Sequence, residues 1–198
     1  MQDDMTMTHG LFDRNRSCLV VIDVQQYFLD KLPPDWCAPL VARIAWLMRV
    51  ARVLDIPVIA TAEDIARDGP LVAELAGELP PGAMVHDKMM FGLCGQASIL
   101  DDVKRSGRSE FILVGLETDV CVAHSAIGLM EQNFRVAVIA DATASPPPYH
   151  DYGIGRMSAA GAMITTVKGI YYEWTRDLAT VNRIRPQIGL TLPPGLTL

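Results

Sequence analysis

The chain has 198 residues, of which 50% are hydrophobic and 20% charged, with a formal net charge of -6. This size and composition suit one core, and we expect a single domain over residues 1–198. The acidic balance argues against a nucleic-acid binder, which needs cationic side chains to neutralise phosphates. Apolar runs stay far below the roughly 20 residues of a membrane span. Residues 1–13 lack the basic and apolar pattern of a signal peptide, so we expect a cytoplasmic protein.

Strand-like and helix-like segments alternate along the chain. In order, the pattern predicts a strand at 18–24, a helix to about 54, a strand at 57–61, a short helix at 70–76 and a weak strand at 84–85. It then predicts a helix at 96–105, strands at 110–115 and 135–140 around a helix at 121–132, a helix at 154–160 and a strand at 163–167. The core should cover about residues 17–175, and residues 186–198 read as an extended tail.

The first long helix is the strongest of these predictions. Asp35 follows a Pro-Pro break and is a candidate N-cap. An apolar stripe at helical spacing follows, made of Leu40, Ile44, Leu47, Ala51 and Leu54.

This alternation predicts an α/β protein, a three-layer α/β/α sandwich with a mainly parallel, Rossmann-like sheet of about six strands. In such sheets ligands bind outside the carboxyl ends of the strands. A nucleotide-binding protein is a rival interpretation, but no Gly-x-Gly-x-x-Gly follows the first strand.

Four cysteines, Cys18, Cys37, Cys94 and Cys121, form no Cys-x-x-Cys pair, so we expect free thiols and no structural zinc. Cys121 follows a predicted strand and opens a predicted helix. Asp23 and Lys88 also lie where predicted strands end, which places all three residues at one edge of the sheet. An aspartate inside an apolar strand is costly to bury unless it is paired.

These residue types suit nucleophilic catalysis. A helix start and a nearby lysine would lower the pKa of the Cys121 thiol. A carboxylate within reach could take the thiol proton and deliver it to a leaving group. Backbone N–H groups in the stretch 115–121 could stabilise an oxyanion.

Three motifs carry a resemblance to a known family. The stretch 19–28, with Asp23-Val-Gln25 and Phe28, resembles the opening Asp-x-Gln-x-x-Phe motif of the isochorismatase-like hydrolases. Lys88 matches their central lysine, and Gly115-Leu-Glu-Thr-Asp-Val-Cys121 looks like their nucleophile motif. The resemblance covers about residues 17–175.

The resemblance implies a set of roles. Cys121 would attack a carbonyl, Asp23 would act as general base and acid, and Lys88 would orient and polarise. A non-proline cis peptide is implied at Leu116–Glu117, with the backbone N–H groups of Glu117 and Cys121 as oxyanion donors. Family members commonly form homo-oligomers, so we expect a dimer or tetramer.

The substrate is less determined. Nicotinamidases of this family carry an Asp-x-His metal site after the second strand, but residues 61–67 contain no histidine. Glu63 and Asp64 are interpreted as solvated loop carboxylates, with cation binding as the alternative. We therefore expect no metal and no cofactor, and an amidase-like enzyme that cleaves an amide, carbamoyl or imide C–N bond in a small molecule. The alternatives are a vinyl ether hydrolase of the isochorismatase type and a catalytically silent binding or assembly module.

Pocket residues are suggested by position alone. Phe28 follows the first motif, Met89 and Phe91 follow Lys88, and His124 lies one helical turn after Cys121. Each is expected to contact substrate, with core packing or an ordinary surface position as the alternative. The aromatic residues Tyr171, Tyr172 and Trp174 could form an interface or dock a terminal helix onto the sheet.

Overall fold

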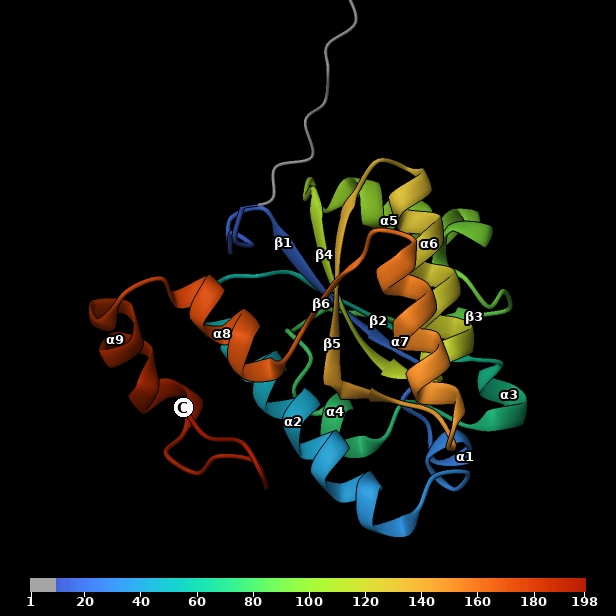
Figure 1. Ribbon diagram of the computed structural model, residues 1–198, viewed down its shortest axis with the longest axis horizontal. Helices are drawn as coiled ribbons and strands as arrows, with labels where there is room; N and C mark the ends of the chain where they lie inside the picture. The colour runs from blue at the N-terminus through green and yellow to red at the C-terminus, as the bar shows by residue number, and fades with distance from the viewer. Residues whose placement is uncertain (1–9) are drawn as a thin grey trace, which may run out of the picture.

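A computed structural model describes residues 10–198 of the chain (Figure 1). The N-terminal residues 1–9, which entered the expectation about a signal peptide, lie outside the described residues. Six parallel strands form one sheet in the order β3-β2-β1-β4-β5-β6. Their bounds are β1 Ser17–Ile22, β2 Val58–Glu63, β3 Val85–Lys88, β4 Glu110–Leu116, β5 Arg135–Ala144 and β6 Met163–Thr165.

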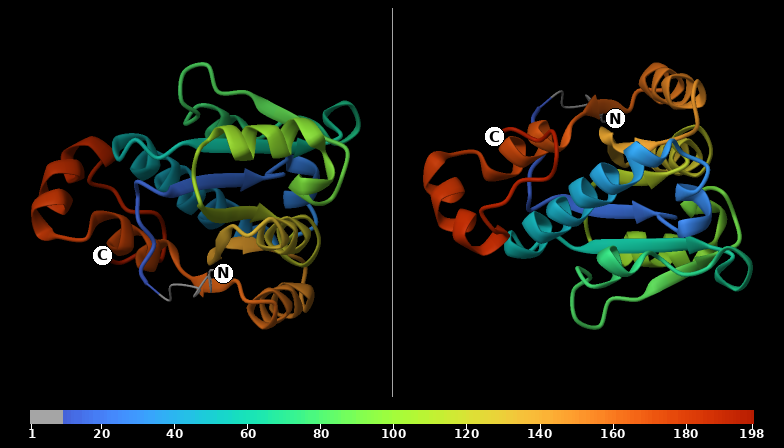
Figure 2. Two further views of the ribbon diagram at one scale, coloured as in Figure 1. Left: turned by 90° about the horizontal axis from the view of Figure 1, so that it is seen from above. Right: turned by 90° about the horizontal axis from the view of Figure 1, so that it is seen from below.

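Helices cover both faces of this sheet (Figure 2). One face packs against α2 (Pro34–Val53), α4 (Ala73–Ala76), α8 (Val167–Thr175) and α9 (Leu178–Ile188). The other packs against α5 (Ala97–Arg105), α6 (Ala123–Glu131) and α7 (Tyr149–Ala159). Short elements lie in the loops: α1 Gln26–Leu29, α3 Ile65–Asp68, the 3₁₀ turn η1 Leu93–Gly95 and the π-helical turn η2 Thr118–Val122. The three-layer α/β/α fold expected from the sequence is confirmed.

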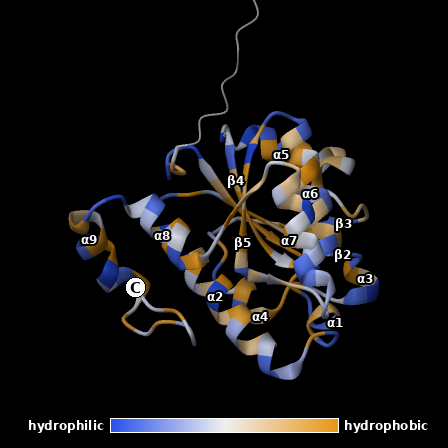
Figure 3. Cartoon of the chain, in the orientation of Figure 1, coloured by the Kyte–Doolittle hydropathy of each residue, from blue (hydrophilic) through white to orange (hydrophobic). Residues whose placement is uncertain are grey.

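The central strands are buried on both faces, which explains their unbroken apolar sequence (Figure 3). Successive side chains of a strand point to opposite faces. In β1, Leu19 and Val21 therefore join the core beneath α2, whereas Cys18, Val20 and Ile22 join the core beneath α5 and α6. A site at the end of β1 is thus fixed by two packed cores at once.

Helix α2 shows why the apolar stripe was a strong signal. All five stripe residues are at least 90% buried against the sheet and the neighbouring helices. The predicted N-cap was wrong, because Pro33 occupies that position and Asp35 lies within the first helical turn. An acidic side chain there still interacts favourably with the helix dipole.

Other boundaries shift for local physical reasons. Helix α7 begins at Tyr149 rather than near 154, because the proline run ends at Pro148 and a helix can start directly after it. The expected tail from residue 186 begins later, since α9 continues to Ile188 and includes Pro186. Strand β5 continues past Ala140 to Ala144, and β6 ends at Thr165.

The aromatic cluster near the C-terminus docks a helix, one of its two expected roles. Tyr171 and Trp174 of α8 are buried, and Trp174 Nε1 donates a 3.0 Å hydrogen bond to Ser17 Oγ at the start of β1. Tyr172 stays 42% exposed, so only this ring is available for an interface. Among the described residues, no helix is long and apolar enough to cross a membrane.

Candidate active site

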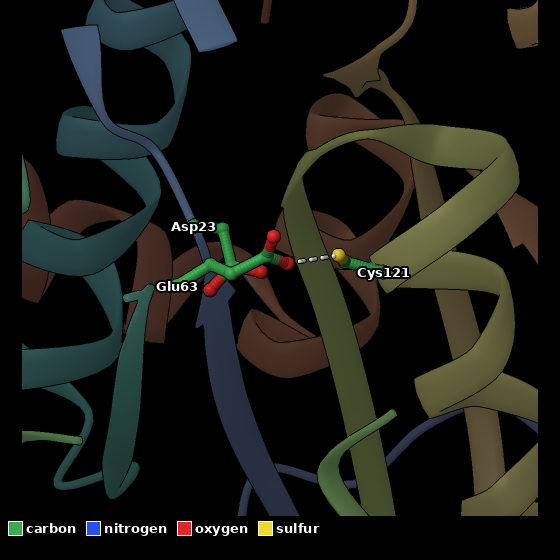
Figure 4. Close-up of side chains that lie close together, drawn as sticks. All are labelled: Asp23, Glu63 and Cys121. Atoms are coloured by element: carbon green, nitrogen blue, oxygen red, sulfur yellow. Dashed lines mark hydrogen bonds between the residues drawn. The ribbon is translucent and has the colours of Figure 1, made fainter. Parts of the chain in front are cut away.

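Four polar side chains meet at the carboxyl edge of the sheet, where the strand order reverses between β1 and β4. Asp23 directly follows β1, and Glu63 is the last residue of β2. Lys88 ends β3, and Cys121 lies in η2, beyond β4. Figure 4 shows the carboxylates of Asp23 and Glu63 beside the sulfur of Cys121. The three residues expected from the sequence therefore come together, and Glu63 joins them.

Asp23 and Lys88 form a fully buried ion pair. Lys88 Nζ lies 2.9 Å from Asp23 Oδ2, and both side chains are 0% exposed. Thr61 Oγ1 donates a 2.7 Å hydrogen bond to Asp23 Oδ1. Burial raises the pKa of Asp23, and the ammonium of Lys88 counteracts it. For Lys88, burial works to lower the pKa, but the facing acidic groups, first Asp23, raise it overall, so the lysine stays charged.

The pKa of the Cys121 thiol is raised by burial and by nearby acidic groups, and lowered by one neighbour, Lys88. Cys121 Sγ lies 3.7 Å from Lys88 Nζ and 3.1 Å from Glu63 Oε2, to which the thiol donates a hydrogen bond. Burial and then the charge of Asp23 raise the pKa of the thiol well above its ordinary value, and Glu63 adds to the rise. The expected lowering of this pKa was wrong for the resting site. The thiol keeps its proton until a group in the site accepts it.

The turn before Cys121 contains the cis peptide implied by the family resemblance. The Leu116–Glu117 peptide bond is cis, and the Glu117 carbonyl accepts hydrogen bonds from the N–H groups of Val120 and Val122. The side chain of Glu117 lies 3.6 Å from Lys31 Nζ, and burial raises the pKa of its carboxyl group. The turn thus places Cys121 at the entrance to α6.

Gly115 explains why a glycine precedes this turn. Its φ is +120°, a conformation that side chains rarely adopt, and a Cβ there would overlap the carbonyl oxygen of Ile22. Strands β1 and β4 can therefore approach closely at the point where Asp23 and the cis peptide leave the sheet.

Helix α7 packs against the same turn from outside the sheet. Thr118 Oγ1 lies 2.9 Å from His150 Nδ1, and Ser145 Oγ donates a 2.6 Å hydrogen bond to Asp119 Oδ1. A Cβ on Gly153 would lie 2.8 Å from both the Cα and the nitrogen of Asp119. Contact this close requires glycine, so α7 fixes the backbone of the turn that carries Cys121.

Replacing Gly153 with alanine is expected to slow Cys121 chemistry by about 10- to 100-fold, because the added methyl group must push the turn away from α7. The rate of hydrolysis, or of Cys121 alkylation, would measure the effect. Gly155→Ala is the matched control on the same helix, since a Cβ there meets nothing within 4 Å. Equal rates in the two variants would contradict a positioning role for this contact.

The expected pocket residues lie in different environments. Phe28 is 4% exposed and packs in the α2-side core, and Lys31 Nζ lies 4.4 Å from its ring centre. Met89 and Phe91 are 65% and 54% exposed on the loop after β3. The Phe91 ring lies edge-on to His124, an exposed residue of α6, at 6.2 Å. Their contact with a substrate stays a prediction.

A cation site was the alternative interpretation of Glu63 and Asp64. Within residues 10–198, the ligand atoms of Asp23, Glu63 and Cys121 lie within 4.8 Å of one another. Lys88 Nζ, however, lies 2.9 Å from Asp23 Oδ2 and 3.3 Å from Glu63 Oε2, so its ammonium supplies the charge that a metal would bring. This donor set does not fit a resident metal ion, and the expectation of catalysis without metal or cofactor stays a prediction. Asp64 instead pairs with Arg67 at 3.7 Å.

The interpretation of Glu63 as a solvated loop carboxylate was wrong. Its side chain is 13% exposed and faces Cys121 and Lys88. Its position at the end of a strand next to β1 was the available signal, because the same rule identified Asp23 and Lys88.

Comparison with known proteins agrees with this fold. The protein-family model of the isochorismatase domain matches residues 17–169 of the chain. The chain belongs to this family, and its hydrolase fold is that of the family. A sequence relative is the secreted isochorismatase effector Isc1 of Phytophthora sojae, 28% identical over 173 residues, covering 81% of this chain and 78% of the effector.

Solved structures are also similar. The MAR1 ribonuclease of Caenorhabditis elegans has a TM-score of 0.83 and 26% identity, covering 96% of this chain and 98% of that one. YcaC of Pseudomonas aeruginosa, solved with covalent acrylamide, has a TM-score of 0.80 and 27% identity, covering 88% and 87%. YcaC of Escherichia coli, described as an octameric hydrolase of unknown specificity, has the same TM-score and identity, covering 90% and 91%.

Proposed function

We propose that this protein is a cysteine hydrolase that cleaves a C–N bond of an amide, carbamoyl or imide type in a small molecule. The observation that carries the proposal is the Cys121 thiol at the sheet edge, in contact with both a buried ammonium and a carboxylate. The covalent acrylamide of the Pseudomonas aeruginosa YcaC supports it, since acrylamide is an electrophile.

The chemistry proceeds through a thioester. Cys121 Sγ attacks the carbonyl carbon, a C–S bond forms, and the carbonyl electron pair moves to oxygen, facing the backbone N–H groups of Glu117 and Cys121. The thiol proton passes to a carboxylate of the site and then to the leaving nitrogen as the C–N bond breaks. Water then attacks the thioester, the C–S bond breaks, and a proton returns to sulfur. Lys88, which forms an ion pair with Asp23, keeps a positive charge beside the sulfur of Cys121 throughout.

The other functions have less support. A vinyl ether hydrolase needs no thiol nucleophile, and a silent binding module needs no buried charged cluster around a cysteine. Ribonuclease activity, named for the Caenorhabditis elegans relative, requires binding of phosphates. The net charge of -6 and the carboxylate of Glu63 beside Cys121 disfavour such a polyanion.

Assembly and location belong to the same proposal. A homo-oligomer is favoured by the octameric YcaC of Escherichia coli, and the exposed ring of Tyr172 is one candidate contact. Light scattering on the purified protein would distinguish the dimer or tetramer expected from the sequence from a larger assembly. The cytoplasmic location stays a prediction, because the Phytophthora sojae relative is described as secreted.

The test is a hydrolysis screen of small amides, ureas and carbamoyl compounds. We expect release of ammonia or an amine together with an acyl adduct on the Cys121 peptide, detected by mass spectrometry. Protein whose Cys121 has first been alkylated with iodoacetamide is the control and should release nothing. Hydrolysis that persists after complete alkylation would exclude the thiol mechanism.

A further inference from the structure

Glu63 accepts a hydrogen bond from the thiol of Cys121. Figure 4 draws this hydrogen bond from Cys121 Sγ to the Glu63 carboxylate. The accepting atom, Oε2, lies 3.1 Å from Cys121 Sγ and 3.3 Å from Lys88 Nζ. A carboxylate this close to a protonated thiol can accept its proton without any rearrangement of the backbone.

Asp23 has less capacity for that role. Its Oδ1 accepts a hydrogen bond from Thr61 Oγ1 at 2.7 Å, and its Oδ2 lies 2.9 Å from Lys88 Nζ. Both oxygens are therefore engaged by other groups, and the hydrogen bond with the Cys121 thiol is the smallest of the influences on the pKa of Asp23. The geometry makes Asp23 the partner that keeps Lys88 charged and in place.

The backbone of Glu63 is held from both sides by one side chain. Gln25 is fully buried, its Nε2 donates to the Glu63 carbonyl at 2.8 Å, and its Oε1 accepts from the Glu63 N–H at 2.7 Å. The same Nε2 also donates to the Gly69 carbonyl at 2.6 Å. These hydrogen bonds fix the backbone from which the Glu63 side chain reaches Cys121.

We propose that Glu63 accepts the thiol proton of Cys121 and delivers it to the leaving nitrogen. The S–H bond breaks and an O–H bond forms on Oε2 as sulfur attacks the carbonyl carbon. The proton then moves to nitrogen as the C–N bond breaks, which leaves Glu63 ionised for the attack of water on the thioester. Gln25 is a positioning residue for this step. The inference rests on the proposed hydrolase function, but its first part concerns the thiol alone.

Several charges act on Glu63 and on the thiol. Lys88 Nζ faces Oε2, and Arg67 Nη2 lies 3.6 Å from Oε1. The charge of Asp23 raises the pKa of the thiol, and the charge of Glu63 raises the pKa of Glu117. Replacing Glu63 with glutamine removes both the proton acceptor and a negative charge beside sulfur, so the thiol should ionise more easily although catalysis becomes slower.

The experiment measures alkylation of Cys121 by iodoacetamide as a function of pH, quantified by peptide mass spectrometry, for the wild type and Glu63→Gln. We expect the apparent thiol pKa to fall by about one unit or more in Glu63→Gln. On a substrate found in the screen, kcat should fall by about 10²- to 10⁴-fold. Asp64→Asn is the matched control, because it removes the neighbouring carboxylate, which pairs with Arg67. It should change neither quantity.

The outcomes separate the two proposals. An unchanged thiol pKa in Glu63→Gln would overturn the contact, and a lowered pKa with unchanged kcat would overturn the proton transfer. If the thiol pKa shifts but the wild type hydrolyses nothing in the screen, the hydrolase proposal has failed, whereas Glu63 is supported as the acceptor of the thiol's hydrogen bond.

Discussion

Replacing Cys121 with alanine is expected to lower kcat by about 10⁴-fold or more on any amide that the wild-type protein hydrolyses. The thioester route has no other nucleophile at this position, and Asp23, Glu63 and Lys88 can only polarise or move protons. The acyl adduct should disappear from the mass spectrum at the same time. The fold should survive, because alanine removes a single sulfur atom from the edge of the core beneath α5 and α6.

Cys18→Ala is the matched control for this variant. Cys18 is buried in the same core, its burial raises the pKa of its thiol to about 12, and it lies in β1 away from the cluster. Its replacement should leave kcat and the adduct unchanged. If the Cys18 and Cys121 variants retained equal turnover, Cys121 would not be the nucleophile.

Replacing Lys88 with methionine is expected to destabilise the protein by about 3–5 kcal/mol at neutral pH, because it leaves a buried carboxylate without its partner. Asp23 has a raised pKa in the folded protein, so the folded state binds a proton more tightly than the unfolded chain does. This contribution to stability is therefore lost as the pH rises from the unfolded pKa through the folded one. Without Lys88, the pKa of Asp23 in the folded protein rises further, and the loss of folding stability above that pKa becomes larger.

The deficit of Lys88→Met should accordingly shrink as the pH is lowered and Asp23 is protonated. Urea unfolding of wild type and variant at mildly acidic and mildly alkaline pH would measure it. Lys104→Met, at an exposed position of α5, is the control and should stay within about 0.5 kcal/mol of wild type at both pH values. A deficit that is absent, or the same at both pH values, would contradict an essential buried pair.

Most of the sheet could be predicted from the sequence because its central strands are buried on both faces and read as apolar runs. The order of the strands along the chain then implied parallel pairing and a common carboxyl edge. Helices α8 and α9 were harder to anticipate. Their apolar residues pack on α2 and on the start of β1, and such long-range packing leaves little trace in local periodicity.

The residues of the candidate site also differ in how far the sequence predicted them. Asp23, Lys88 and Cys121 were accessible because each is chemically unusual at the end of a strand and the motif spacing is specific. Glu63 was missed: its position at the end of β2 was a signal, but the sequence of an acidic residue there looks the same whether its side chain faces solvent or sulfur. The expected direction of the Cys121 pKa was wrong for a related reason: burial, the largest influence on this pKa, and the charges of Asp23 and Glu63 come from residues far apart in the sequence.

The two hydrogen bonds between the Gln25 side chain and the Glu63 backbone influence the distance between the carboxylates of Asp23 and Glu63. Asp23 and Gln25 belong to one short segment, so the peptide that carries the first carboxylate also sets the position of the second. The length of the Gln25 side chain thus sets the distance between the segment after β1 and the end of β2. A shorter amide, as in Gln25→Asn, would leave every charged residue in place and still change the distance between them. In this fold, the composition of the site and its dimensions are therefore specified by different residues.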